Sequence, residues 1–236
     1  MKTKKPIVLS LILAAFVPVH AQQAFQDLDF ELANPVAGQG DPGGTATSAS
    51  SLPGWNVSMG ATPQTFVYQN TLTLGLGSVD LLGPGYAAAG TQGPGNAGVM
   101  DGRYTLFLQA GSPLGRGAAT IDQVGTIPLG DVTIEWKQWD WSPAATLMSV
   151  TFGGNALTPV VMGSGANYTL YGADVTGYSG QTADLQFSAQ WDNGTPSWVG
   201  LDDISFSPTA VVPEPNIAVL GMMGGVVFAL RRRFVR

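Results

Sequence analysis

Two tryptophans near the middle of the chain are the side chains best suited to binding a small molecule. Successive side chains of an extended strand point to opposite faces, so the segment 131–141 would place Trp139 and Trp141 on one face, beside charged residues. Flat aromatic rings next to hydrogen-bonding groups suit sugars, because a pyranose has an apolar C–H face and a polar hydroxyl edge. We therefore predict that both tryptophans bind glycan. The alternative is that they pack beneath a neighbouring loop, since Ser142-Pro143 ends the strand there.

Acidic residues dominate the body of the chain. Between Gln22 and Val212 there are 3 basic and 15 acidic residues, which gives a net charge of −12. Such a surface repels nucleic acid and anionic lipid and attracts cations. We therefore expect no nucleic-acid partner.

Several catalytic groups are missing from the body. The chain has no cysteine, and its one histidine, His20, lies in the N-terminal segment. The body therefore lacks the residues for a Ser-His-Asp triad, a Cys-His pair or a His/Cys zinc site. Glu31 and Glu135 are its two glutamates, and no spacing indicates the paired carboxylates of a glycosidase. We predict that the protein is not an enzyme, with a carboxylate-only glycoside hydrolase as the least favoured alternative.

The elements that position these residues are predicted to be strands. Segments rich in β-branched and aromatic residues alternate with turns rich in Gly, Pro, Asn and Asp, and no segment shows helical periodicity. This pattern predicts an all-β, antiparallel β-sandwich, with residues 34–51 as a mobile loop. The predicted strands are 24–31, 54–59, 65–74, 78–82, 104–109, 117–127, 131–139, 146–152, 167–171, 182–191 and 199–207.

Three short motifs resemble a known type of module. Phe30-Glu31, then Gly54-Trp55-Asn56-Val57, and finally Asp202-Asp203-Ile204-Ser205-Phe206 are similar to calcium-containing jelly-roll modules of the carbohydrate-binding, galactose-binding-like type. The resemblance implies a jelly roll whose first and last strands lie side by side. It also implies a structural calcium ion held by Glu31 with Asp203 or Asp202. Carboxylate oxygens suit Ca²⁺, and two like charges brought together need a cation. The alternative is a solvated carboxylate pair at a sheet edge.

The N-terminus has the pattern of a secretory signal peptide. Lysines at positions 2, 4 and 5 precede an apolar run at 7–19, and Val19-His20-Ala21 offers small residues for cleavage after Ala21. The predicted organisation is a signal peptide at 1–21, a β-sandwich domain at 22–207, a linker at 208–212 and a sorting signal at 213–236.

The C-terminus combines three features in order. Pro213-Glu214-Pro215 precedes an apolar run of about 14 residues, and a cationic cluster follows. The run is too short for a standard bilayer core of about 30 Å. This tail resembles the PEP-CTERM sorting signal. The cluster includes Arg231, Arg232 and Arg233.

The tail's resemblance implies export by the Sec machinery in a Gram-negative bacterium and processing by an exosortase. It further implies that a short C-terminal transmembrane helix holds the chain transiently in the inner membrane. We therefore expect a cell-surface or extracellular-matrix protein associated with extracellular polysaccharide, with a jelly-roll module that binds glycan. The alternative is a structural matrix or biofilm protein without a defined ligand.

Overall fold

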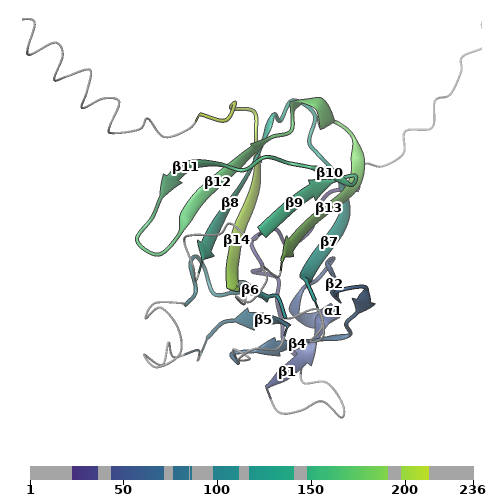
Figure 1. The fold of residues 1–236 in the computed structure, drawn as a ribbon, viewed down its shortest axis with the longest axis vertical. Coiled ribbons are helices and arrows are strands. Elements are labelled where there is room, and N and C mark those ends of the chain that lie inside the picture. Colours follow the sequence, from purple (N-terminus) through teal and green to yellow (C-terminus); the bar gives the residue numbers. More distant parts are fainter. Residues whose placement is uncertain are drawn as a thin grey trace, which may run out of the picture.

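The computed structural model describes residues 23–36, 44–71, 77–84, 86, 98–111, 117–140, 148–190 and 198–212 (Figure 1). The predicted signal peptide and sorting signal lie outside these ranges, as does Trp141. Within the described ranges, no helix is both long and apolar enough to cross a bilayer.

The described residues form two β-sheets, and the prediction of an all-β sandwich is confirmed. All strand pairs are antiparallel except β4 with β5. The eight-stranded sheet has the order β1 (Thr45–Thr47), β4 (Phe66–Gln69), β5 (Ser78–Leu82), β6 (Thr105–Gln109), β14 (Trp198–Ser207), β8 (Thr133–Asp140), β12 (Thr169–Asp174), β11 (Val160–Ser164). The six-stranded sheet has the order β10 (Asn155–Ala156), β9 (Met148–Phe152), β13 (Thr182–Ala189), β7 (Ala119–Thr126), β2 (Asn56–Met59), β3 (Thr62–Pro63).

Aromatic side chains join the two sheets across the core. Trp136 on β8 meets Phe187 on β13 with ring centroids 5.7 Å apart, and Trp55 lies 6.4 Å from the same phenylalanine. Trp136 and Phe187 are almost fully buried, as is Ile134 two residues before Trp136. Edge-to-face ring pairs of this kind add to the stabilisation from buried apolar area. The alternation of β8 therefore fixes which of its side chains face the core.

Several predicted strands match the structure closely, and other regions differ. The range 78–82 is reproduced as β5. The prediction of a mobile loop at 34–51 is wrong, because this segment contains β1 and the short helix α1 (Ser48–Ser51). β11 was also missed, and a 3-10 turn, η1 (Thr176–Tyr178), follows β12.

The predicted first strand, 24–31, is wrong. Asp27 and Phe30 have φ of 49° and 59°, in the left-handed region that a strand cannot use. The Asp27 carboxylate accepts a hydrogen bond from the Leu32 amide at 2.8 Å, which closes a turn. The segment still lies beside β14, because the Ile204 amide donates to the Leu28 carbonyl at 3.0 Å.

A β-bulge interrupts β14 where its acidic pair lies. The register with β8 shifts between Asp202 and Ser205, and Asp203 has φ of 47°. In a regular strand two consecutive side chains would face opposite sides of the sheet. A bulge re-aims side chains locally, so both carboxylates can line the same space.

Candidate ligand cleft and carboxylate cavity

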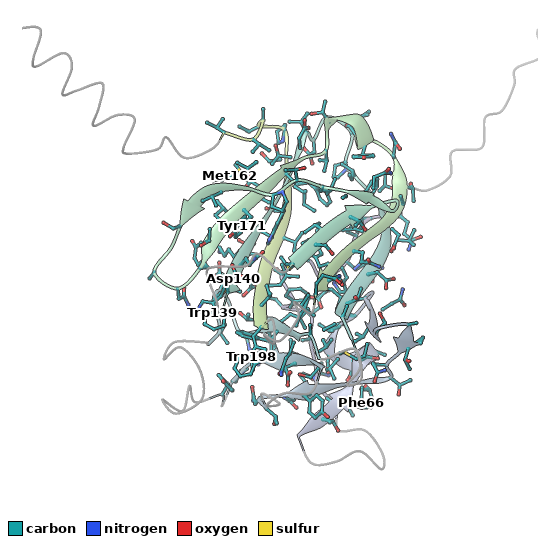
Figure 2. The ribbon with its side chains drawn as sticks, in the orientation of Figure 1. Phe66, Trp139, Asp140, Met162, Tyr171 and Trp198 are labelled. Carbon is teal, nitrogen blue, oxygen red and sulfur yellow. The ribbon has the colours of Figure 1, made fainter. Side chains whose placement is uncertain are left out.

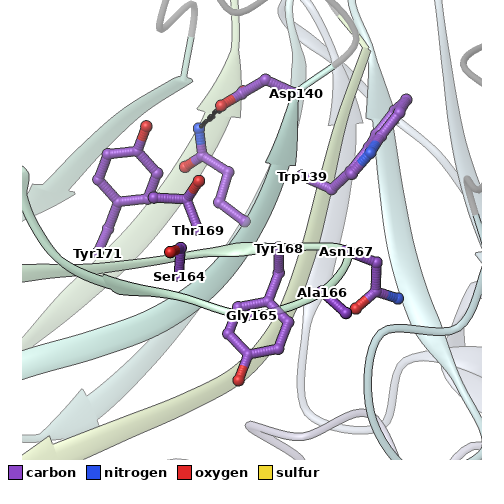
Figure 3. A pocket seen from close by; sticks show the side chains of 10 residues that line it. Trp139, Asp140, Ser164, Gly165, Ala166, Asn167, Tyr168, Thr169 and Tyr171 are labelled. Carbon is purple, nitrogen blue, oxygen red and sulfur yellow. Dashed lines mark hydrogen bonds between the residues drawn. The ribbon is translucent and has the colours of Figure 1, made fainter.

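A cleft of about 380 Å³ lies where β8 ends beside β11 and β12. Trp139, Tyr168 and Tyr171 supply its aromatic lining, and Ser164 and Asn167 are among its polar lining residues. Figure 3 shows Tyr171 and Ser164 on one side of this space and Asn167 and Trp139 on the other. We call this space the aromatic cleft. Its lining residues are Gln138, Trp139, Asp140, Ser164, Gly165, Ala166, Asn167, Tyr168, Thr169 and Tyr171.

Trp139 combines the two roles that the sequence left open. It lines the aromatic cleft, and its ring packs against Phe107 with centroids 5.5 Å apart. The side chain is half-buried and joins a small apolar cluster of Leu82, Phe107 and Tyr86. Trp139 is therefore held in place by packing while part of it borders the cleft.

The register between β8 and β12 builds the floor of the cleft. Gln138 pairs with Thr169 and Trp136 pairs with Tyr171. The rings of Trp136 and Tyr171 stack at 5.9 Å with an interplanar angle of 15°. Tyr171 is thus oriented by a buried core residue.

A second cavity, of about 230 Å³, is lined by carboxylates from three separate parts of the chain. We call it the carboxylate cavity. Glu31 comes from the N-terminal segment, and its Oε1 accepts hydrogen bonds from the amides of Arg103 at 2.6 Å and Tyr104 at 3.0 Å. Gly102 permits this approach, because a Cβ there would collide with the Glu31 carboxylate. The acidic lining residues are Asp29, Glu31, Asp101, Asp202 and Asp203.

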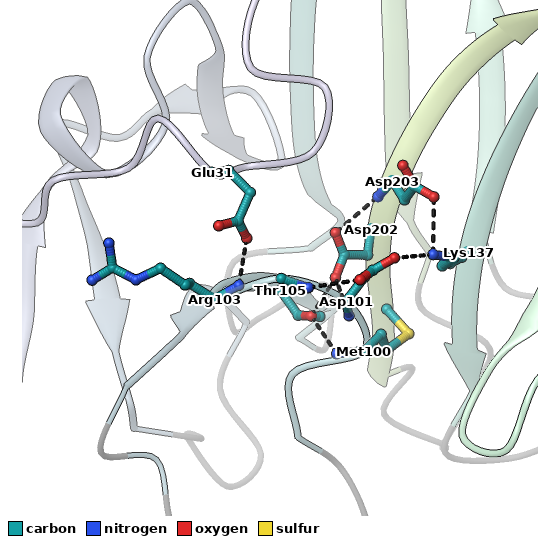
Figure 4. A network of polar contacts seen from close by, with 9 residues as sticks. Glu31, Met100, Asp101, Arg103, Thr105, Lys137, Asp202 and Asp203 are labelled. Atoms are coloured by element: carbon teal, nitrogen blue, oxygen red, sulfur yellow. Dashed lines mark hydrogen bonds and ion pairs between the residues drawn. The ribbon is translucent and has the colours of Figure 1, made fainter.

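Lys137 partly neutralises the carboxylate cavity. Its ammonium forms an ion pair with Asp101 and another with Asp203, the latter at 2.9 Å (Figure 4). Burial opposes the charge on Lys137, but its bonds to the two aspartates outweigh this and raise its pKa. The hydrogen bond from Lys137 in turn lowers the pKa of Asp101.

Asp202 is the most buried acid of this cavity, with 1% of its surface exposed. Its carboxylate accepts hydrogen bonds from Thr105 Oγ1 at 2.5 Å and from the amides of Asp101 and Asp203 at 3.1 and 2.8 Å. These bonds favour the ionised form, but desolvation outweighs them and raises the pKa of Asp202 to about 7. The cavity therefore holds a carboxyl group that is only partly ionised near neutral pH.

The residues of the carboxylate cavity have the oxygen chemistry that suits a hard cation such as Ca²⁺. The structure brings the three predicted calcium ligands, Glu31, Asp202 and Asp203, to one space. Among the described residues, however, no group of three or more acidic, histidine or cysteine side chains is arranged to hold a metal ion. The bonds of Lys137 and of the backbone amides take up part of the carboxylate oxygens instead.

Asp80 on β5 is a third unusual acid. It is fully buried, its Oδ2 accepts a hydrogen bond from Ser78 at 2.6 Å, and its Oδ1 has no partner. Burial raises the pKa of Asp80 to about 8, so it is mostly protonated at neutral pH.

The sequence missed several residues of both sites. Asp101 belongs to the carboxylate cavity, and Gln138, Asp140 and Tyr171 belong to the aromatic cleft. The alternation of β8 did contain a signal, because Gln138 and Asp140 share a face with Trp136. The strand that pairs with β8 carries the rest, and a single sequence does not reveal that pairing.

Comparison with known proteins identifies no family. No protein-family model matches the chain, and no curated protein matches it. Among solved structures, the Stig cyclase Fisc from Fischerella sp. TAU, in complex with (3Z)-3-(1-methyl-2-pyrrolidinylidene)-3H-indole, is 13% identical with a TM-score of 0.46; the match covers 80% of this chain and 98% of that one. The apo form of a cyclase from Fischerella sp. is 11% identical with a TM-score of 0.45, covering 81% and 98%.

The prediction that the protein is not an enzyme is corrected by these neighbours. They are cyclases, which are enzymes. Carboxyl and phenol groups can act as general acids and bases without His or Cys, so the absence of those two residue types from the body does not exclude catalysis. At these identities and TM-scores the likeness gives this chain no activity, substrate or residue role.

Proposed function

We propose that the β-sandwich is a glycan-binding module of an exported protein that acts at the cell surface or in the extracellular matrix. The observation that carries this proposal is the aromatic cleft, where three aromatic side chains meet hydrogen-bonding groups. Its volume of about 380 Å³ falls in the range of roughly 300–1,000 Å³ that small-molecule sites occupy. Aromatic faces accept the C–H side of a sugar, and the amide, hydroxyl and carboxylate groups accept its hydroxyl edge.

Retardation in a polysaccharide gel tests the binding. The exported protein should migrate more slowly in a gel that contains the producer's own exopolysaccharide than in a plain gel. Tyr168→Ala, Trp139→Ala and Trp141→Ala should each reduce this retardation about tenfold or more. Phe66→Ala is the matched control, because Phe66 is a half-buried aromatic on β4, apart from the cleft (Figure 2).

Three outcomes of this assay have distinct meanings. Equal retardation of the wild type and of the variants at the cleft residues Trp139 and Tyr168 would remove the cleft from the proposal. No retardation at all, together with weaker biofilm cohesion in a deletion strain, would favour a structural matrix protein. Release of new reducing ends from the polysaccharide would show that the site also performs hydrolysis.

Export and sorting are proposed from the two chain ends. The signal pattern at 1–21 and the tail at 213–236 would direct Sec-dependent export, a transient stay in the inner membrane through a short helix, and processing by an exosortase. Mass spectrometry of the extracellular form should show a C-terminus near Pro213-Glu214-Pro215. An extracellular form that retains the cluster Arg231, Arg232 and Arg233 would contradict processing.

We assign the sandwich to the jelly-roll type, with a structural calcium ion in the carboxylate cavity. Two mainly antiparallel sheets support the first assignment. The second is supported by the carboxylates that share one cavity around the buried Asp202. Glu31, Asp202 and Asp203 would hold the ion, and it would link the N-terminal segment to β14.

A thermal melt tests the calcium site. A ligand at 100 times its Kd stabilises a protein by about 2.7 kcal/mol, so millimolar Ca²⁺ should raise Tm by about 5 °C or more relative to EDTA. Glu31→Gln should abolish this difference, whereas Glu135→Gln, outside the cavity, should retain it. Identical wild-type melts in Ca²⁺ and EDTA would remove calcium from the proposal.

A further inference from the structure

A buried hydrogen-bond chain runs along one face of β8 and ends in the aromatic cleft. The Trp136 indole N–H donates to Gln138 Oε1 at 3.0 Å. The Gln138 amide nitrogen then donates to both carboxylate oxygens of Asp140, at 2.8 and 3.0 Å. Trp136 and Gln138 are each 1% exposed, while Asp140 is only partly buried and lines the cleft (Figure 3).

The hydrogen bonds from Trp136 through Gln138 to Asp140 all run in one direction, from donor to acceptor. An indole N–H can only donate, so it fixes the Gln138 carbonyl toward Trp136 and the amide NH₂ toward Asp140. Asp140 must then accept, which favours its carboxylate form. Each carboxylate oxygen has about two lone-pair sites, and Gln138 uses one on each. One acceptor site on each oxygen therefore remains for a bound molecule.

Asp140 also sets the charge of the cleft. It is the one charged side chain among the described residues that line this space, because the others are aromatic, amide, hydroxyl or small. The neighbouring Lys137 has its ammonium 5.2 Å from the ring of Tyr168, a cleft residue, but this charge is paired with Asp101 and Asp203. A ligand with carboxylate or sulfate groups would meet an uncompensated negative charge, whereas a ligand with hydroxyl or amino groups would meet an acceptor.

From this geometry we infer that Asp140 is the specificity-determining hydrogen-bond acceptor of the aromatic cleft and that it selects neutral, hydroxyl-rich sugars over anionic ones. Gln138 is a positioning residue that holds the carboxylate in place. The inference rests on the proposed glycan-binding function and names its substrate class.

Matched polymer pairs test the selectivity in the wild-type protein. Affinity electrophoresis of the exported protein would compare dextran with dextran sulfate, and hydroxyethyl cellulose with carboxymethyl cellulose. The body's net charge of −12 repels any polyanion, so the gels would contain about 0.5 M salt, where exposed charges are screened within a few ångströms. We expect the neutral member of at least one pair to bind at least tenfold more tightly than its anionic partner.

Variants of Asp140 test the residue itself. Asp140→Asn is a nearly isosteric change. It should weaken binding of the neutral polymer about tenfold and reduce the difference in affinity between the neutral and the anionic polymer. Asp131→Asn, just before the opposite end of β8, is the control that removes the same charge and should change neither value. Thermal melts of both variants would verify that they are folded.

Gln138→Met tests the positioning role through its pH profile. The Gln138 hydrogen bond lowers the pKa of Asp140 and opposes the dominant effect of burial, which raises it. Removing that bond should therefore shift the acid loss of sugar binding to higher pH. The other titratable groups that line the cleft beside Asp140 are the phenols of Tyr168 and Tyr171. An unshifted profile would overturn the role of Gln138.

The remaining outcomes separate the two proposals. If the wild type binds the neutral polymer and Asp140→Asn binds it equally well, this inference is overturned and the glycan-binding function stands. If the wild type prefers the anionic polymers, the substrate class is overturned. If it binds no polymer, including the producer's own, the proposed function falls and the inference falls with it.

Discussion

The aromatic cleft and the carboxylate cavity both depend on side chains of β8, and they handle charge in opposite ways. On one face of β8, Gln138 directs neutral hydrogen bonds to Asp140 and leaves its outward acceptor sites open. On the other face, Lys137 places a full positive charge between Asp101 and Asp203. The cleft thus leaves hydrogen-bond acceptors open to a ligand, whereas in the cavity the Lys137 ammonium offsets the repulsion between carboxylates of the protein itself.

The difference shows how a single strand can serve two sites. Side-chain alternation sends residues 136, 138 and 140 to one side and residues 137 and 139 to the other. Two residues are exceptions, because Trp139 lines the cleft although it shares a side of β8 with Lys137, and Tyr168 lines the cleft and also lies 5.2 Å from the Lys137 ammonium.

Removing the cation should have the largest effect. Lys137→Met keeps the length of the apolar stem but leaves Asp101 and Asp203 without their ion pairs. Breaking a buried pair costs about 3–5 kcal/mol, and exposed pairs contribute about 0–1 kcal/mol. The aspartates of these pairs are about half exposed while Lys137 is mostly buried, so we expect a loss of about 2 kcal/mol in the free energy of unfolding.

Urea unfolding in EDTA would measure this loss. Arg103→Met is the matched control, because the described interactions of its side chain are limited to a cation–π contact with Tyr104. Added Ca²⁺ should stabilise Lys137→Met more than the wild type, because the ion would replace the lost charge. A variant as stable as the wild type in EDTA would contradict the role given to Lys137.

The second effect concerns pH. Folding raises the pKa of Asp202 to about 7 from 3.8 in the unfolded chain, so between these values the native state binds the extra proton. Stability from this group is therefore present below about pH 4 and is lost as pH rises toward 7, at up to about 1.4 kcal/mol per pH unit. Asp202→Asn should flatten the stability profile between pH 5 and 7 by about 1 kcal/mol per unit.

The pKa of Asp80 is shifted in the same direction as that of Asp202, and Asp80 serves as a comparison outside the carboxylate cavity. Its pKa is raised to about 8 by burial, so Asp80→Asn should flatten the profile up to about pH 8 instead. Calcium should abolish the effect of Asp202 but not that of Asp80, since Asp80 does not line the carboxylate cavity. Equal responses of both variants to calcium would contradict a calcium effect that is specific to the carboxylate cavity. Urea midpoints at half-unit pH intervals would resolve the slopes.

The sequence predicted the strands that carry these sites better than it predicted which side chains line them. Alternation and turn residues were sufficient for β5, β8 and β14, because local periodicity reflects which face is buried. The carboxylates at 31, 202 and 203 were also predicted to share a site. Their supporting residues were not found, since Asp101 reaches the cavity from a loop about 100 residues before Asp202.

Two physical features account for the misses. The turn at Asp27 to Leu32 depends on left-handed backbone angles at Asp27 and Phe30, which are uncommon for residues other than glycine. The aromatic cleft depends on the pairing of β8 with β12, and register is a long-range property that no single segment contains. Tyr168 and Tyr171 therefore carried no visible relation to Trp139 until the strands were placed side by side.

The smallest predicted effect concerns the one contact that joins the two regions. The Lys137 ammonium lies 5.2 Å from the centroid of the Tyr168 ring, and such cation–π contacts contribute about 0.5–1 kcal/mol at partly exposed sites. A double-mutant cycle of Tyr168→Leu with Lys137→Met should give a coupling energy of about 0.5 kcal/mol in urea unfolding. Distant residues add independently, so the cycle of Phe66→Leu with Lys137→Met should give a coupling near zero, because β5, β6 and β14 separate β4 from β8 in the sheet. A coupling of several kcal/mol between Tyr168 and Lys137 would mean that the cleft and the cavity act as one site, because occupation of either would then change the other.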